Sequence, residues 1–242
     1  MPGGTDDFAV YASLEGVPSA LTAARDGIDA LLRDRGLRRT TAELTAESLL
    51  RGAVASAALD GSISTVEDVR AGRADQVAAR AVRLNSRLLS LVPVIGRSPL
   101  QALARMHSLV AAPGTTPDQI GRPRAHADVT VGLQALARQL LATTGAPSLA
   151  VASWAHASVA TLAPFESGNG LVARALERLL LVARGVDPPS LTVPEGGHRA
   201  AERAYREALT AFAEGGLEGR RRWLLYAANA LTVGASLSPM RS

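Results

Sequence analysis

Apolar residues recur at three- and four-residue intervals along almost the whole chain, and this spacing constrains the fold more than any other feature of the sequence. Leu21, Ile28 and Leu31, for example, fall on one side of a helix. Aromatic residues make up only 3% of the chain, whereas Ala, Leu and Arg, which favour helices, are abundant. The sequence therefore predicts an all-α fold. The predicted helices span about 18–34, 40–61, 72–91, 99–110, 127–143, 148–162, 169–184, 194–213 and 217–234.

Two missing residue types exclude several kinds of chemistry. The sequence has no Lys and no Cys, so all 26 of its basic residues are Arg. Without Lys there is no Schiff-base chemistry and no phosphate loop of the Walker type. Without Cys there are no disulfides, thiolate nucleophiles or Cys-bound metal centres. The four His residues, at positions 107, 126, 156 and 198, never lie four residues apart, so we expect no two-His helical metal site and no metal ligands.

The charge pattern argues against nucleic acid as a partner. The formal net charge is +4, and the pI of about 10.5 reflects the absence of Lys rather than a basic patch. The one compact basic run, Arg220–Arg222, follows Glu214 and Glu218, which predicts a solvated helix face. The N-terminus lacks a signal-peptide pattern, and no apolar run reaches the roughly 18 residues of a spanning helix. We therefore expect a cytoplasmic protein with no membrane partner.

Length and segmentation predict a single domain. A chain of 242 residues falls between one and two domains by length, and this one carries no repeat and no low-complexity linker. We expect a flexible N-terminus over 1–14, one helical domain over 15–235 and a frayed tail over 236–242. The Ala- and Arg-rich, Lys-free composition indicates a high-GC bacterial gene.

Residues 163–174 form an irregular segment within a predicted helix-loop-helix at 148–184. Gly168, Asn169 and Gly170 lead directly into a helix N-terminus. Unpaired backbone N–H groups and the positive end of the helix dipole meet there, so the junction can hold a phosphate or carboxylate. The two glycines let an anion approach the backbone closely. The alternative is a simple helix–helix turn capped by Asn169.

Two segments of the chain resemble the Fic family (Fic/Doc or Fido-domain proteins), whose members move AMP from ATP onto protein hydroxyls. The first resembles the family signature H-P-F-x-[D/E]-G-N-G-R-x-x-R. The second lies in the predicted helix at 40–61 and resembles the inhibitory segment [S/T]-x-x-x-E-[G/N]. The matching residues are Pro164, Phe165, Gly168, Asn169, Gly170 and Arg174 in the first segment, and Ser56, Asp60 and Gly61 in the second.

The resemblance covers about residues 15–235 and implies a Fic/Doc-like helical domain. It implies that ATP or another nucleotide, or an anion, contacts Gly168, Asn169, Gly170 and Arg174, and that Pro164 and Phe165 are structural. Family members also carry a β-hairpin flap that aligns the target. The run Gly121–Arg124 enters a helix without such an insertion, so we expect little or no flap.

Three departures from the signature remove the chemistry that the family needs. Ala163 stands at the position of the catalytic His, and a methyl group cannot accept a proton. Ser167 stands at the position of the acidic Mg²⁺ ligand, and a neutral hydroxyl is a weak ligand for a hard cation. Leu171 replaces the first Arg, which neutralises phosphate charge. Glu166 is acidic but lies one residue too early. Ordinary AMP transfer is therefore not expected.

The inhibitory-type segment predicts a specific contact. A carboxylate in the last turn of a helix opposes the helix dipole, so Asp60 needs a compensating cation, and Arg174 is the natural partner. The alternative is a plain Asp60-Gly61 turn that ends the helix. His156 lies two helical turns before Ala163, roughly 10 Å along the axis, which is too far to replace the missing base. We expect His107 and His156 in the core, and His126 and His198 in solvent.

Three functional hypotheses remain open. The leading one is a degenerate Fic-fold protein that binds a nucleotide, an anion or a protein partner without transferring AMP. The second is a divergent transferase of a nucleotidyl or phosphoryl group that uses Glu166 or Ser167. The third is an interaction scaffold in which the motif persists only for packing. The sequence leaves the ligand, the partner and the oligomeric state open.

Overall fold

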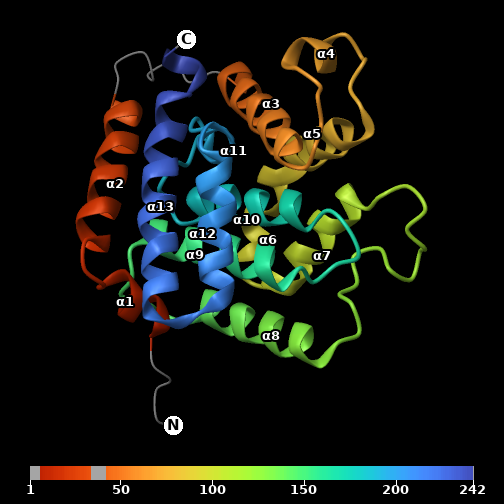
Figure 1. The fold of residues 1–242 in the computed structure, drawn as a ribbon. Helices are drawn as coiled ribbons and strands as arrows, with labels where there is room; N and C mark the ends of the chain where they lie inside the picture. Colours follow the sequence, from red (N-terminus) through yellow and green to blue (C-terminus); the bar gives the residue numbers. More distant parts are fainter. Residues whose placement is uncertain (1–5, 34–41, 242) are drawn as a thin grey trace.

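The computed structural model describes residues 6–33 and 42–241, and these residues form one bundle of helices (Figure 1). No strand occurs among them, as the sequence predicts. No helix in the described part is long and apolar enough to cross a membrane. The helices are α1 (Asp7–Ala12), α2 (Val17–Arg33), α3 (Ala42–Leu59), α4 (Val66–Arg70), α5 (Gln76–Leu88), α6 (Val92–Ile95), α7 (Pro99–Val110), α8 (Ala127–Leu141), α9 (Ser148–Leu162), α10 (Asn169–Ala183), α11 (Pro194–Ala200), α12 (Glu202–Glu214) and α13 (Gly216–Ser236), with short 3₁₀ turns η2 (Leu89–Leu91) and η3 (Pro239–Arg241).

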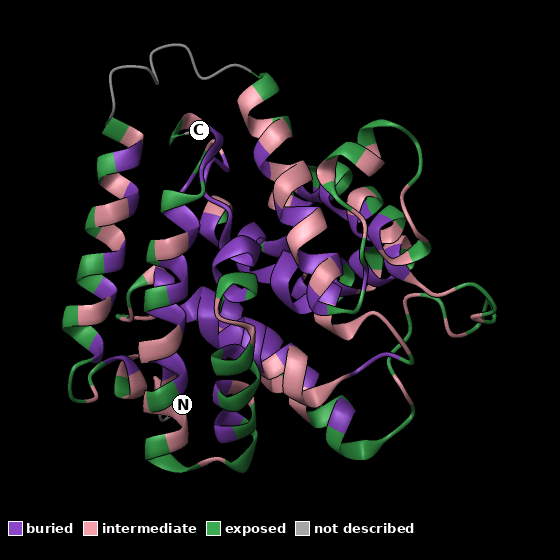
Figure 2. Cartoon of the chain, turned by 45° about the horizontal axis from the view of Figure 1, so that its top comes forward, coloured by how far each residue is buried: buried purple, intermediate pink, exposed green. Residues whose placement is uncertain are grey.

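Helices α9 and α10 pack against each other at the centre, and the other helices surround them (Figure 2). Nearly every residue of α10 from Leu171 to Leu181 is buried, and so is the first half of α9. Both helices are apolar on most of their circumference, which is the pattern of a helix enclosed on all sides. The polar side chains that these two helices do carry must therefore find partners inside the protein.

Both end segments of the described chain contain buried residues. The segment 1–14, predicted to be flexible, contains helix α1, whose Phe8 is buried and meets Trp154 edge-on with ring centroids 6.0 Å apart. In the predicted tail 236–242, Ser238 and Pro239 are buried. Parts of both segments therefore pack against the rest of the domain. Residues 1–5 and 242 lie outside the described part.

Helix α3 covers the start of α10. It packs against α5 and α11 and ends at Leu59, after which Gly61 turns the chain with φ +91°. The helix predicted at 40–61 is therefore present over 42–59, while its first two residues lie outside the described part. Because α3 ends beside α10, its last turn can interact with the helix N-terminus that the sequence analysis singled out.

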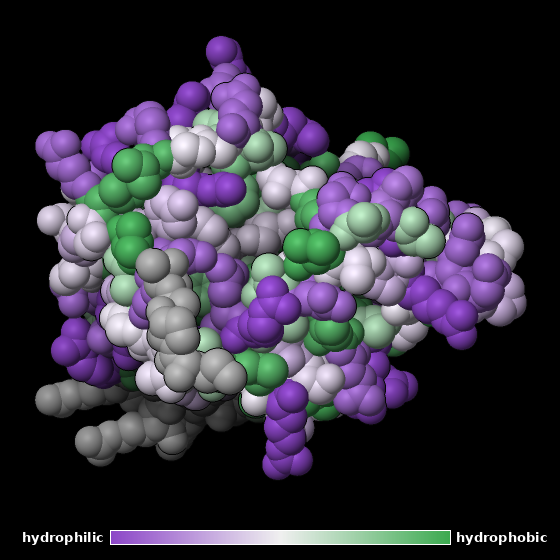
Figure 3. Space-filling view, turned by 90° about the horizontal axis from the view of Figure 1, so that it is seen from below, coloured by the Kyte–Doolittle hydropathy of each residue, from purple (hydrophilic) through white to green (hydrophobic). Residues whose placement is uncertain are grey.

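Seen from below, the surface mixes polar and apolar patches, and the apolar ones are scattered (Figure 3). The exposed large apolar residues of the described part are likewise spread over several elements, including Val131 and Leu141 on α8 and Leu217 on α13. Single exposed apolar residues are common on monomeric proteins. The described residues on this face therefore form no extensive apolar patch in the view of Figure 3.

Candidate anion site at the start of helix α10

The link between α9 and α10 is a short loop with left-handed residues at both ends. Ala163 ends α9 with φ 43° and ψ 60°, and Gly168 precedes α10 with φ 71° and ψ 12°. No side chain caps α10. Its first backbone N–H groups therefore have no partner within the helix, and the end of α3 lies close by.

Asn169 fastens this loop instead of facing a ligand. Its Oδ1 accepts a hydrogen bond from the Phe165 N–H at 2.8 Å, and its Nδ2 donates to the Phe165 carbonyl at 2.7 Å. Phe165 is buried and stacks on His107 with centroids 4.1 Å apart. His107 in turn accepts a hydrogen bond from the Gly121 N–H at 2.9 Å. Both polar ends of the Asn169 amide are thus engaged, and Phe165 anchors the loop to α7.

Arg174 and Asp60 form the ion pair that the helix-end argument favours. The Arg174 Nη2 lies 2.6 Å from the Asp60 Oδ1, and it also donates to the Ser56 carbonyl at 3.0 Å. The Arg174 Nε donates to the Ser56 hydroxyl at 2.8 Å. The Arg174 side chain is 2% exposed and that of Asp60 27% exposed. The pair therefore sits at the edge of the protein, with the cation inside and the carboxylate partly solvated.

The Asp60 carboxylate lies directly against the first turn of α10. A Cβ added to Gly170 would be 2.8 Å from the Asp60 Oδ1 and 3.0 Å from the Arg174 Nη1. Only glycine leaves room for a carboxylate and a guanidinium this close to the backbone. The carboxylate that follows the last residue of α3 thus lies beside the first turn of α10 and pairs with Arg174.

The positions that depart from the signature carry different side chains in different surroundings. Ala163 carries only a methyl group, and the Ser167 hydroxyl accepts a hydrogen bond from the Ala112 N–H at 3.3 Å. Leu171 is buried in the core, and Glu166 is exposed to solvent.

A hydrogen-bonded chain of buried side chains runs behind Arg174. The Arg174 Nη1 donates to the Tyr205 hydroxyl at 3.3 Å, which lies 2.9 Å from the His156 Nε2. The His156 Nδ1 lies 2.9 Å from the Glu177 Oε2, and the His198 Nε2 lies 2.7 Å from the same oxygen. If each His donates to Glu177, His156 accepts from Tyr205, so the guanidinium is supported by a continuous polar path.

The buried hydrogen-bond network around Glu177 shifts the pKa values of its side chains. Burial lowers the pKa of His156 to about 4, because desolvation outweighs the attraction of Glu177. Burial alone would raise the pKa of Glu177, but His156 and His198 together lower it well below its usual value. Burial also raises the pKa of the Tyr205 phenol. At neutral pH this network therefore contains a charged Glu177 and a neutral His156.

His198 corrects one prediction from the sequence. It was expected in solvent, but it lies on α11 and is fully buried, with its Nδ1 3.1 Å from the Tyr226 hydroxyl. Glycine explains the burial, because a Cβ on Gly197 would lie 1.9 Å from the Ala230 carbonyl oxygen, and α11 can therefore press against α13. His107 and His156 are buried and His126 is exposed, as expected.

One group of side chains in the described part of the chain has the spacing of metal ligands. Its ligand atoms, from His156, Glu177 and His198, lie within 4.8 Å of one another. The two His–Glu177 contacts are hydrogen bonds of ordinary length, and the second ring nitrogens face Tyr205 and Tyr226. The arrangement is satisfied as a hydrogen-bond network. The spacing rule for helical His pairs missed this cluster because its members come from three helices.

A second buried ion pair lies one turn further along α10. The Arg178 Nε and Nη2 donate to the two carboxylate oxygens of Glu195 at 2.9 and 2.7 Å, and both side chains are buried. The Arg178 Nη1 also donates to the Ser190 hydroxyl at 2.9 Å. No helix-end or motif pattern of the sequence points to this pair. The available signal was the Glu177-Arg178 dipeptide inside the apolar stretch of the helix at 169–184.

Solved structures of known proteins share this architecture. A Fic family protein from Desulfovibrio desulfuricans G20 gives a TM-score of 0.76 at 20% identity, covering 92% of this chain and 74% of that one. Fic-1 from C. elegans gives 0.67 at 18% identity, covering 90% and 70%. A Fic domain containing signaling protein from Bacteroides thetaiotaomicron VPI-5482 gives 0.63 at 13% identity, covering 90% and 94%.

The chain has the Fic fold. The predicted all-α, Fic-like architecture is therefore confirmed. No known family profile and no curated protein matches the sequence itself. A shared fold does not determine activity, which depends on the side chains present at the site.

Proposed function

We propose that this Fic-fold protein is a degenerate relative of the protein AMP-transferases, one that binds the phosphate end of a nucleotide at the start of α10 without transferring AMP. Asp60 acts as a built-in competitor for that position. The contact of the Asp60 carboxylate with Arg174 and with the Gly170 backbone carries the proposal. A phosphate needs the same two partners, a guanidinium and a helix N-terminus.

Loss of AMP transfer follows from the side chains of the loop. Without a general base at position 163, the transfer rate falls by about 10²- to 10⁴-fold. The buried Leu171 offers no charge for a phosphate, and Ser167 is already engaged by the Ala112 backbone. The residues present fit a phosphate group but not the Mg²⁺ ion of the family reaction, because no carboxylate pair faces the helix N-terminus.

Calorimetric titration with ATP, ADP and AMP tests the proposal. We expect weak binding that does not require Mg²⁺, because Arg174 and the α10 backbone supply the contacts. We also expect AMP to bind more weakly than ATP, since an extended phosphate chain can reach past Asp60. Binding that strictly requires Mg²⁺ would contradict the proposal and support a divergent transferase, and no binding of any nucleotide would support a scaffold.

A transfer assay with labelled ATP separates binding from catalysis. We expect no labelled product on the protein itself or on proteins of a lysate, because Ala163 cannot accept a proton. The matched control is the Asn169→Ala variant, which opens the loop by removing both hydrogen bonds to Phe165. AMP transfer by the wild type that disappears in this variant would show that the site is catalytic after all.

A further inference from the structure

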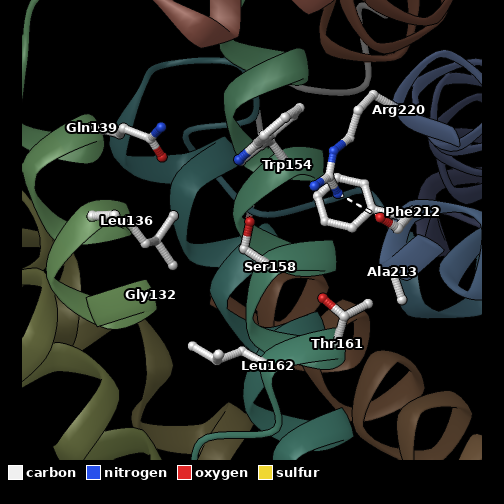
Figure 4. Close-up of a pocket in the computed structure, with 11 residues that line it drawn as sticks. Gly132, Leu136, Gln139, Trp154, Ser158, Thr161, Leu162, Phe212, Ala213 and Arg220 are labelled. Atoms are coloured by element: carbon white, nitrogen blue, oxygen red, sulfur yellow. Dashed lines mark hydrogen bonds between the residues drawn. The ribbon is translucent and has the colours of Figure 1, made fainter. Parts of the chain in front are cut away.

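A cavity lies on the side of α9 that faces away from α10. It has a volume of about 360 Å³ and opens between α8, α9, α12 and α13 (Figure 4). Clefts of this size are large enough for a small organic ligand. The residues around it are Gly132, Ala135, Leu136, Gln139, Trp154, Ser158, Thr161, Leu162, Phe212, Ala213 and Arg220.

Arg220 gives this cavity a cation without a counter-charge. Its guanidinium lies over the Phe212 ring at 3.8 Å and over the Trp154 ring at 5.1 Å, and its Nη1 donates to the Phe212 carbonyl at 2.6 Å. Within the described part of the chain Arg220 forms no ion pair, whereas Arg221 and Arg222 on the same helix pair with glutamates. Arg220 thus differs from the other two arginines of the run in stacking on aromatic rings.

Arg220 is half-buried and has no carboxylate partner in the described part of the chain. Desolvation lowers the pKa of Arg220 from its usual value, while a hydrogen bond with the Tyr11 side chain opposes that shift. The two aromatic rings stabilise the cation further through their π-faces. A charged acceptor binds a guanidinium more strongly than a neutral hydroxyl or carbonyl does, so an anion entering the cavity would gain from this cation.

Other hydrogen-bonding groups face the same space. Figure 4 shows the Ser158 hydroxyl and the Trp154 indole nitrogen turned toward the cavity, and neither makes a hydrogen bond within the described part of the chain. The Gln139 amide nitrogen donates to Asp7 at 3.1 Å. Leu136 and Leu162 supply an apolar wall opposite Arg220. The cavity thus combines donors near one cation with an apolar surface.

We propose that this cavity binds a small amphipathic organic anion, with its charged group on Arg220 and Ser158 and its apolar body against Leu136, Leu162 and Trp154. A guanidinium and a hydroxyl match a carboxylate, and the apolar wall matches a short hydrocarbon chain or ring. The site is separate from the start of α10 and does not depend on nucleotide binding there.

Titration with octanoate, compared with its neutral analogue octanamide, tests this site. Calorimetry gives the affinity, and the fluorescence of Trp154, which lines the cavity, reports occupancy. We expect octanoate to bind more tightly than octanamide by roughly tenfold, because a hydrogen bond to a charged group is the stronger one. Arg220→Gln should remove this difference, and Arg222→Gln, which changes an exposed residue of the same helix, should preserve it.

A second variant tests the same proposal in case Arg220→Gln disturbs the fold. Ser158→Leu fills the cavity from α9 and leaves the Arg220 side chain in place, and it should abolish binding while circular dichroism stays unchanged. Equal affinity for octanoate and octanamide would overturn the proposal. So would unchanged binding in Ser158→Leu, or no binding of octanoate at millimolar concentration. Asp60→Ala should leave octanoate binding unaffected, which separates this site from the one at α10.

Discussion

Replacing Arg178 by methionine should lower the free energy of unfolding by about 3–5 kcal/mol. The substitution keeps the length and apolar stem of the side chain but leaves the buried Glu195 carboxylate without its bidentate partner. An unpaired buried charge is far more costly than the loss of the pair as a whole. Urea unfolding followed by circular dichroism measures the change.

Two further variants show whether the charge itself is responsible. Arg178→Met combined with Glu195→Leu removes both charges and should recover most of the lost stability. Arg203→Met is the matched surface control, because the Arg203 side chain is 94% exposed and its removal should change stability by less than about 0.5 kcal/mol. If Arg178→Met unfolds at the same urea concentration as Arg203→Met, the buried pair does not contribute as described.

Acidification should destabilise the protein through the buried chain behind Arg174. His156 has a native pKa of about 4, and an unfolded His has a pKa near 6.5. Between these values the unfolded state binds the proton and the native state does not, so stability falls as the pH falls. The loss is roughly 1.5 kcal/mol between pH 6.5 and pH 5. Glu177, whose native pKa is lowered, adds a further loss below its unfolded pKa.

Thermal unfolding at several pH values measures this effect. His156→Gln keeps a donor for Glu177 but cannot titrate, so its melting temperature should depend less on pH between 7 and 5 than that of the wild type. His126→Gln changes an exposed His and should leave the wild-type profile intact. A His156→Gln profile that parallels the wild-type profile would mean that another group controls the acid response.

The sequence predicts the all-α fold and the contact between Asp60 and Arg174, because both follow from helix patterning. Helical periodicity sets the all-α architecture, and the charges at helix ends bring Asp60 and Arg174 together. The helix-loop-helix at 148–184 is present as α9 and α10, with bounds close to those predicted. Ser56 could be placed beside Asp60 by spacing, but its bonds to Arg174 depend on how α3 lies on α10.

Other parts of the site depend on tertiary packing that one sequence does not reveal. Tyr205, His156 and His198 meet Glu177 because α9, α11 and α12 converge on α10. His198 lies in a segment with two glycines, which resembles a solvated loop by composition alone. Asn169 has the same spacing whether it holds a ligand or its own loop, and only the Phe165 contacts distinguish the two.

The environment of Arg220, at the protein surface, also depends on tertiary packing and could not be predicted from the sequence. This arginine stands in a run of three arginines that resembles a solvated helix face, yet its helix turns it toward Phe212 and Trp154. Sequence spacing identifies the helix, but the position of α12 decides which of the three arginines stacks on Phe212. The stacking of one cation of a charged run on aromatic rings is therefore visible only in the folded chain.

Calorimetry with inorganic pyrophosphate tests most directly whether Asp60 occupies an anion site. The measurement compares the affinity of the wild type with that of Asp60→Ala. Removing the carboxylate frees Arg174 and the first turn of α10, so we expect roughly tenfold tighter binding. We also expect a free energy of unfolding lower by about 1–3 kcal/mol without ligand, since Arg174 is buried and Asp60 partly exposed. Glu67→Ala, an exposed acid just beyond the α3 turn, is the control for net charge and should change neither quantity. Equal pyrophosphate affinity in wild type and Asp60→Ala would contradict the account.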